Sequence, residues 1–176
     1  MGESINLIFN HAQQQTIAHS FANEWMLVKN IIHIHQLMYL KKLETSAPPQ
    51  SVIDKYSSLR IPLGLLQIPV ENALLHGLSN RVQKPWLLTI EITEDEKSVM
   101  ISITDNGVGR EMAATLSNYQ KHGTGTKNLS GILEIVNAKN IDKIAIKYLD
   151  GIFTEGIVVF GTKVIISIPK QFIYED

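Results

Sequence analysis

The sequence of 176 residues contains no cysteine. This absence excludes disulfide bonds, a cysteine nucleophile and cysteine-ligated metal sites, and it is compatible with a cytoplasmic location. The sequence also lacks an apolar run of the ~18–20 residues that span a bilayer, and its first residues do not resemble a signal peptide. We therefore expect a cytoplasmic chain without membrane contact, with any membrane anchor lying outside it.

Neither sign of charge dominates, because 16 Lys and Arg residues nearly balance 17 Asp and Glu residues, for a net charge of -1. Without a basic surface field, nucleic acid is not an expected partner. Internal repeats and low-complexity tracts are also missing. What the chain does have is 44% hydrophobic residues. At this length that content suffices for one globular domain with a buried core and an added helical segment.

The first part of the chain predicts a helix over residues 20–43, with Ser20 as its N-cap. Its apolar stripe comprises Phe21, Trp25, Val28, Ile31 or Ile32, His35 and Met38. This helix either packs on the domain that follows or continues into a dimerisation stalk. The segment TSAPPQS at 45–51 cannot continue a helix. We therefore place the boundary there, with 1–45 as an N-terminal helical segment and 46–176 as the main domain.

The main domain shows alternating strand patterns and two helical ones. Pro62 could open a helix that ends near Gly77, and the internal Pro69 allows a kink or a later start. Residues 86–93 and 99–104 alternate as paired strands do and predict a hairpin. A further helix is expected over 127–138, and further strands over 143–149 and 157–168.

Three polar segments interrupt these core patterns: Glu71-Asn72 with His76, DNGVG at 105–109, and GTGTKN at 123–128. Each has a structural explanation, since buried polar residues are usually satisfied locally and Asn-Gly suits a hairpin turn. Asn72 and His76 share one helix face, whereas Glu71 is rotated from it by about 100°. Gly-Thr-Gly ahead of a helix can bind an anion through its backbone N–H groups.

In this order, the three segments resemble the GHKL ATPase superfamily, and within it sensor histidine kinases of the LytS type. The LytS motif reads approximately P-x-x-x-x-Q-P-L-V-E-N-A-x-x-H-G, and this chain has PLGLLQIPVENALLHG over 62–77. GTKVIISIP at 161–169 is similar to the family's last strand, and the resemblance covers at least 20–169. It implies an α+β fold, a two-layer α/β sandwich of the GHKL (Bergerat) type. A mixed, mostly antiparallel sheet would carry about three helices on one face, in addition to the N-terminal segment.

The resemblance implies a site for ATP and Mg²⁺. Asp105 matches the carboxylate that accepts a hydrogen bond from the adenine amine, and Thr162 matches a threonine that supports this contact, often through water. Asn72 matches the asparagine whose amide oxygen binds Mg²⁺. Glu71 matches a glutamate proposed to act as a catalytic base or to position the nucleophile.

The resemblance also implies contacts around the phosphates. His76 would contact the phosphates or order their water. Gly107 and Gly109 would let the backbone pass close to the nucleotide. The phosphates would be held at a helix start by Gly123, Gly125, Lys127 and Asn128. Residues 110–122 resemble the mobile ATP lid, in which Lys121 and His122 either reach the nucleotide or belong to a solvated loop.

The chain departs from the LytS pattern in three places. Ile68 stands where proline is usual, with proline at Pro69 instead, and Ile132 replaces an arginine of the glycine-loop helix. The phosphoacceptor segment, which resembles Q-I-N-P-H-F-L-F-N, is not identified, and no phosphoacceptor role is assigned to His11, His19, His33 or His35. We therefore expect the catalytic part of a larger sensor, downstream of the histidine that it phosphorylates.

The leading hypothesis is an ATP-binding catalytic domain of a two-component sensor histidine kinase. It would transfer the γ-phosphoryl group to a histidine on phosphoacceptor helices outside this chain, from which a response regulator takes it. The full-length protein is expected to be a homodimer, and this fragment alone to be inactive. Alternatives are a non-catalytic nucleotide-sensing GHKL module and an anti-sigma-factor serine kinase. A gyrase- or MutL-like clamp is disfavoured, because few residues follow Pro169 and such proteins need a transducer domain.

Overall fold

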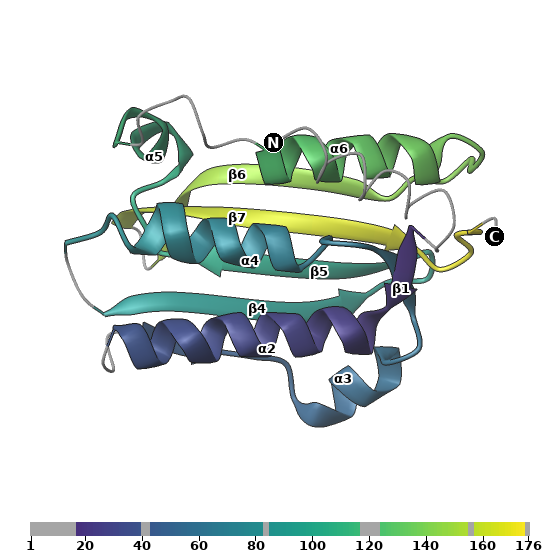
Figure 1. Cartoon of the computed structure of the whole chain (residues 1–176), viewed down its shortest axis with the longest axis horizontal. Coiled ribbons are helices and arrows are strands. Elements are labelled where there is room, and N and C mark those ends of the chain that lie inside the picture. Colours follow the sequence, from purple (N-terminus) through teal and green to yellow (C-terminus); the bar gives the residue numbers. More distant parts are fainter. Residues whose placement is uncertain (1–16, 40–42, 83–84, 117–123, 155–156, 175–176) are drawn as a thin grey trace, which may run out of the picture.

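The computed structural model describes residues 17–39, 43–82, 85–116, 124–154 and 157–174. Its centre is a five-stranded sheet in the order β2-β4-β5-β7-β6 (Figure 1). The strands are β2 (Leu43–Ser46), β4 (Trp86–Glu94), β5 (Ser98–Asp105), β6 (Ala145–Thr154) and β7 (Ile157–Pro169). β2 pairs in parallel with β4, and every other neighbouring pair in this sheet is antiparallel.

Helices α2 (Phe21–Met38), α4 (Gln67–Asn72) and α6 (Thr124–Asn137) lie on one face of the sheet (Figure 1). The remaining elements are β1 (Ala18–Ser20) paired with β3 (Arg60–Pro62), α3 (Gln50–Tyr56), the π-helix η1 (Ala73–Leu78) that continues α4, and α5 (Arg110–Leu116). The predicted fold class, a two-layer α/β sandwich with a mixed and mostly antiparallel sheet, is confirmed. Within the described ranges, no helix has both the length and the apolar character needed to cross a bilayer.

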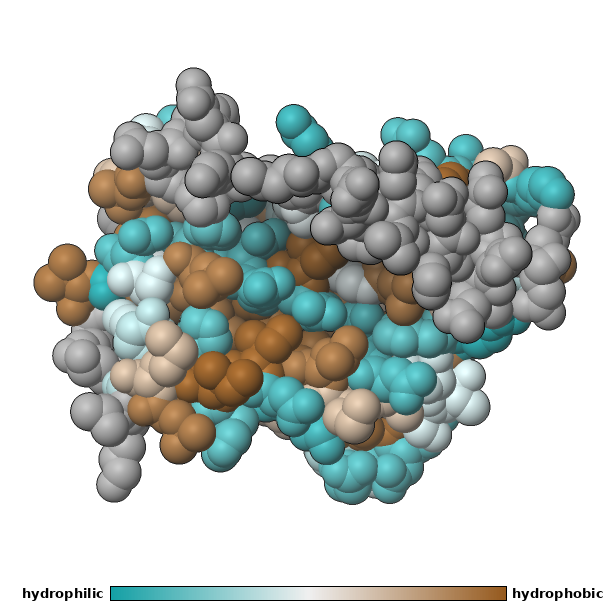
Figure 2. All heavy atoms as spheres, in the orientation of Figure 1, coloured by the Kyte–Doolittle hydropathy of each residue, from teal (hydrophilic) through white to brown (hydrophobic). Residues whose placement is uncertain are grey.

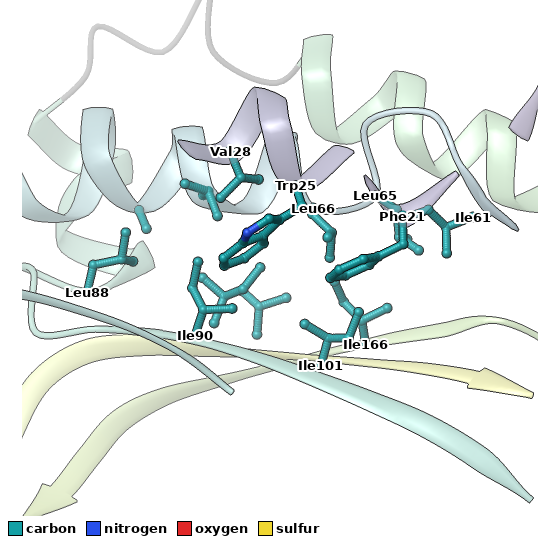
Figure 3. Packing of buried hydrophobic residues seen from close by; sticks show 14 of the residues in the cluster. Phe21, Trp25, Val28, Ile61, Leu65, Leu66, Leu88, Ile90, Ile101 and Ile166 are labelled. Carbon is teal, nitrogen blue, oxygen red and sulfur yellow. The ribbon is translucent and has the colours of Figure 1, made fainter. Parts of the chain in front are cut away.

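The core lies between the sheet and these helices. Buried residues alternate along β5 as Val99, Ile101 and Ile103, because successive side chains of a strand point to opposite faces. Helix α2 contributes Phe21 and Trp25, which point from the helix toward the sheet (Figure 3). Burying a side chain of this size stabilises the fold by roughly 1.5–3 kcal/mol. Helix α2 therefore packs on the domain.

The N-terminal helix shares its core with the rest of the chain. Ser20 caps α2 as predicted, with its Oγ accepting the Asn23 N–H at 3.3 Å. The helix ends at Met38, however, and residues 43–46 form the edge strand β2, which the sequence did not predict. The boundary predicted between residues 45 and 46 thus falls inside β2. Apolar residues of α2 and α3, from either side of that boundary, belong to one hydrophobic cluster.

The buried stripe of α2 differs from the predicted one at its end. Met38, expected on the stripe, is 63% exposed, and it follows the exposed Ile34 and Leu37. On the side of the molecule that Figure 2 shows, exposed apolar side chains lie among polar ones. Tyr39 packs instead, stacked on His35 with ring centroids 5.6 Å apart. The reason is that the chain leaves the helix at Tyr39, which turns its ring back to the core.

The second predicted helix begins later than Pro62. Pro62 ends β3, and α4 starts at Gln67, so the later start that Pro69 allowed is the one observed. Pro69 is the third residue of α4, where a backbone N–H would have no partner inside the helix, so proline is tolerated. The predicted hairpin is confirmed as β4 and β5. Helix α6 begins at Thr124, three residues before the predicted start.

Candidate functional site

A cavity of about 430 Å³ lies between the helices and the sheet. Its walls come from α4 and η1, from the end of β5 with the start of α5, from the first turn of α6, and from β6 and β7. Seven of the predicted site residues line it: Glu71, Asn72, His76, Asp105, Gly109, Gly125 and Thr162. The fold thus brings together polar segments that are far apart along the chain.

Asp105 is the last residue of β5 and is only 4% exposed. Its Oδ1 accepts the backbone N–H of Gly107 at 2.8 Å. Burial raises the pKa of the Asp105 carboxyl to about 6, although backbone hydrogen bonds from Gly107 and Thr162 favour the charged form. A buried carboxyl with a perturbed pKa on a cavity wall is typical of a ligand-binding position. At neutral pH it is mostly ionised and can only accept hydrogen bonds.

Gly107 does not line the cavity, and its neighbours show what it does instead. A Cβ at Gly107 would lie 2.5 Å from the carbonyl oxygen of Gly77 and 2.6 Å from Oδ1 of Asp105. The next residue, Val108, donates its N–H to that same Gly77 carbonyl at 3.1 Å. Gly107 therefore allows the turn after β5 to pack directly against η1, which holds the Asp105 carboxylate in place.

The segment DNGVG connects β5 to α5 and is not a hairpin turn. Gly109 has φ +80°, a left-handed conformation that glycine adopts without strain, and it lines the cavity where α5 begins. The Asn106 side chain points back to β4, accepting the Leu87 N–H at 2.8 Å and donating to the Pro85 carbonyl at 3.1 Å. The Asn106 side chain thus links the end of β5 to the start of β4, whereas Asp105 and Gly109 of the same segment line the cavity.

Glu71, Asn72 and His76 all face the cavity, although the α-helical spacing placed Glu71 on a neighbouring face. The difference comes from the π-helical turn η1, in which the Ser79 N–H donates to the Leu74 carbonyl five residues earlier, at 3.1 Å. A wider turn brings residues five apart onto one face. Single π-turns of this kind occur often at functional sites.

Asn72 links α4 to α6 across the cavity. Its Nδ2 donates to Thr126 Oγ1 at 3.5 Å, so the amide oxygen is its remaining polar atom. Gly125 and Thr126 line the cavity from the first turn of α6. Lys127 and Asn128 are exposed and do not line it, because the early helix start turns them toward solvent. Gly123, Lys121 and His122 lie outside the described residues.

Two polar cavity residues, Arg110 and Tyr148, were not among the predicted site residues, although Arg110 is the first residue of the segment that resembles the lid. Arg110, at the start of α5, donates from Nε to Asp150 Oδ1 at 3.0 Å and from Nη2 to Oδ2 at 2.6 Å. Its guanidinium also lies 4.7 Å from the ring centre of Tyr148, which comes from β6. The ion pair raises the pKa of Arg110 and lowers that of Asp150, and burial raises the pKa of Tyr148. This cluster fixes one wall of the cavity to the sheet.

His35 of α2 lies close enough to Glu71 for their charges to interact. Its side chain is 7% exposed, and in the described part of the chain its Nδ1 has no hydrogen-bond partner. Burial lowers the pKa of His35, while the negative charge of Glu71 opposes that shift. His35 is therefore a buried, mostly neutral ring at neutral pH.

The structure is similar to that of the mycobacterial sensor histidine kinase MprB, with a TM-score of 0.50 over 83% of this chain and 95% of that one. At 12% identity the likeness shows the fold alone, which is that of a sensor histidine kinase domain.

Two curated relatives match part of the sequence. An 82-residue segment is 38% identical to the sensor protein LytS of Oceanobacillus iheyensis, covering 44% of this chain and 14% of that protein. A 59-residue segment is 41% identical to the sensor histidine kinase/phosphatase LytS of Staphylococcus aureus, covering 34% of this chain and 10% of that protein. No family model matches the chain. The predicted resemblance to LytS-type sensor histidine kinases is confirmed, and the chain spans only a small part of those relatives.

Proposed function

We propose that this chain is the ATP-binding catalytic domain of a two-component sensor histidine kinase. It transfers the γ-phosphoryl group of ATP to a histidine outside the chain, and a response regulator then takes that group. The names of the partial sequence relatives support a histidine kinase role. The observation that carries the ATP site is the buried Asp105 carboxyl on the wall of a 430 Å³ cavity that Asn72 and Glu71 also line.

The adenine base fits the Asp105 end of the cavity. An ionised carboxylate only accepts hydrogen bonds, and the exocyclic amine of adenine only donates them. Thr162 pairs with Asp105 across β5 and β7 and is also buried, so its hydroxyl can support the same contact. The apolar side chains of Ile103 and Val164 line the cavity beside them and suit the faces of a base.

The phosphates and Mg²⁺ fit the α4 end. Within the described ranges, no cluster of three or more His, Asp or Glu side chains could hold a metal ion by itself. This suits Mg²⁺ bound mainly by phosphate oxygens and water, with the Asn72 amide oxygen as a protein ligand. When bound, Mg²⁺ neutralises phosphate charge during phosphoryl transfer. His76 contacts the phosphates or their water, and Gly125 holds them from the first turn of α6.

Glu71 orients the incoming nucleophile or accepts its proton. It lines the cavity one residue before Asn72, so a carboxylate stands beside the expected metal position. A positioned carboxylate is the type of group that phosphoryl transfer uses for this task. The fragment alone is inactive, because the histidine that it phosphorylates lies outside it. The full-length protein is a homodimer that brings the two parts together.

Calorimetric titration with a non-hydrolysable ATP analogue, with and without Mg²⁺, tests the site. Asn72→Ala should remove most of the affinity gained from Mg²⁺ and leave metal-free binding nearly unchanged. Asn80→Ala is the matched control, because the Asn80 side chain donates to the His76 carbonyl at 2.8 Å and Asn80 does not line the cavity. A folded wild-type chain that binds no analogue would contradict the proposal. Binding without phosphohistidine formation in a longer, phosphoacceptor-containing chain would favour a nucleotide-sensing module.

A further inference from the structure

The first turn of α4 is capped by a side chain from a different helix. The N-cap residue of α4, Leu66, offers no side-chain cap of its own. Glu24 of α2 supplies it: Oε2 accepts the N–H groups of Leu66 and Gln67, both at 3.0 Å, and Oε1 accepts the Gly64 N–H at 2.8 Å. One carboxylate thus accepts the N–H groups of Leu66 and Gln67, which the helix start leaves without intrahelical partners, and a third from Gly64 in the turn before α4.

Glu24 is only 1% exposed, so its carboxylate oxygens depend on protein groups for their hydrogen bonds. A fourth comes from His19 of β1, whose Nε2 lies 2.9 Å from Oε1. A buried carboxylate is costly unless it is hydrogen-bonded, and a negative charge at a helix N-terminus is favourable. Both conditions are met here. The contact therefore ties α4 to α2 at a defined position.

Helix α2 is itself held by the core. Phe21 and Trp25 point toward the sheet on either side of Glu24 along the helix (Figure 3). The Phe21 N–H also donates to the Leu59 carbonyl at 2.7 Å. The carboxylate is consequently presented from a rigid support, and its place decides where α4 begins.

Glu71 and Asn72 follow Gln67 by four and five residues, which is about 6–7.5 Å along a helix. We propose that Glu24 is a positioning residue that holds α4 so that Glu71 and Asn72 face the cavity, and that it couples the position of α2 to metal-dependent nucleotide binding. The identity of the ligand in this inference, ATP with Mg²⁺, rests on the proposed function. The adenine end, built on β5 and β7, does not depend on this cap. The two ends of the site should therefore respond differently to its loss.

The first test needs no nucleotide. Glu24→Gln replaces an acceptor oxygen by an NH₂ group that faces backbone donors. Amide hydrogen exchange of this variant should become faster across residues 64–72 and remain unchanged in β4 and β5. Unchanged exchange across 64–72 would overturn the inference. If Glu24→Gln does not fold, His19→Ala removes one of the four contacts and should give a smaller increase in the same segment. No increase with His19→Ala would then overturn the inference.

The second test measures affinity for the ATP analogue with and without Mg²⁺. Glu24→Gln should reduce the affinity gained from Mg²⁺ about tenfold or more, since small misplacements of functional groups cost up to about 100-fold. Metal-free affinity should change by less than about twofold. Ser20→Ala, which removes the exposed N-cap of α2 itself, is the control and should alter neither value. An equal loss with and without Mg²⁺ would show a general structural role and overturn the inference. A wild-type chain that binds no nucleotide contradicts the proposed function, and hydrogen exchange then decides the inference.

Discussion

Replacing Asp105 by asparagine is expected to make the folded protein more stable at pH 8 while weakening ATP binding. Burial raises the pKa of Asp105 from 3.8 to about 6 in the folded state. The folded state therefore holds a proton that the unfolded state releases between about pH 4 and pH 6. Stability falls as the pH rises through that window, and the full cost of the buried charge is present above it.

The magnitude follows from the size of the pKa shift. A shift from 3.8 to about 6 corresponds to about 3 kcal/mol at 1.36 kcal/mol per unit. Asparagine is neutral at every pH and keeps an oxygen that can accept the Gly107 N–H. Asp105→Asn should therefore stabilise the protein by up to about 3 kcal/mol at pH 8, and by only about 1 kcal/mol at pH 4.5, where most of the wild-type carboxyl is protonated.

Urea unfolding of both proteins at pH 4.5 and pH 8 measures these values. The buried Trp25 and Trp86 report the transition by fluorescence, and linear extrapolation yields the free energy of unfolding. Calorimetric titration at pH 8 measures the second effect. Losing a hydrogen bond to a charged group costs about 1.5–3 kcal/mol, so affinity for the ATP analogue should fall about 10- to 150-fold.

Asp95→Asn is the matched control. Asp95 also accepts two backbone N–H groups, from Lys97 at 2.8 Å and Ser98 at 2.7 Å, but in the exposed turn between β4 and β5. These bonds lower the pKa of Asp95, so its contribution is stabilising above the unfolded pKa and is lost as the pH falls. Asp95→Asn should therefore destabilise the protein at pH 8 and leave nucleotide affinity unchanged.

Three results would contradict the reasoning on Asp105. A less stable Asp105→Asn variant at pH 8, or one stability difference at both pH values, would mean that burial does not raise the pKa of this carboxyl. A more stable variant with unchanged nucleotide affinity would support the electrostatics and contradict the adenine assignment.

Four further expected outcomes concern packing and pH. Gly107→Ala should destabilise the protein by about 1–3 kcal/mol in urea unfolding, because its Cβ meets the Gly77 backbone. A Cβ added at Gly131 in helix α6 would have nothing within 4 Å, so Gly131→Ala should stabilise the protein by about 0.5–1 kcal/mol. The same change in the free energy of unfolding for both alanine variants would contradict the packing role of Gly107. Trp25→Ala should cost about 3–5 kcal/mol, and a loss below about 1 kcal/mol would show that α2 is not part of the core. Adenosine affinity, followed by NMR titration, should fall about tenfold from pH 7 to pH 5 as Asp105 is protonated, whereas a flat profile would exclude this acceptor.

Local patterns predicted the local structure well. The hairpin of β4 and β5 follows from alternation within each strand, and the Ser20 cap follows from one side chain next to a helix start. Both depend on residues close together in the chain. Residues 43–46, by contrast, carry one buried side chain, and they form a strand only because β4 pairs with them in parallel from more than 40 residues away.

The fold, and not the local sequence, also decided that the Glu24 side chain is buried. Glu24 is acidic and close to polar neighbours in the sequence, so nothing local indicated that it is one of the most buried residues. It is stable there because the chain returns after β3 and presents the backbone donors of residues 64, 66 and 67. The sequence shows only that residue 24 is a glutamate. The cap forms because folding brings together two segments that lie about 40 residues apart in the chain.

The sequence by itself determined part of the cavity wall: Asp105 where a strand ends, Asn72 within a helix, and the glycines Gly109 and Gly125. Tertiary structure decided how they are used. It placed Gly107 against Gly77 and brought Tyr148 into the wall from β6. A motif records residue types and spacing along the chain, but cavity walls form from contacts between segments that only long-range packing brings together.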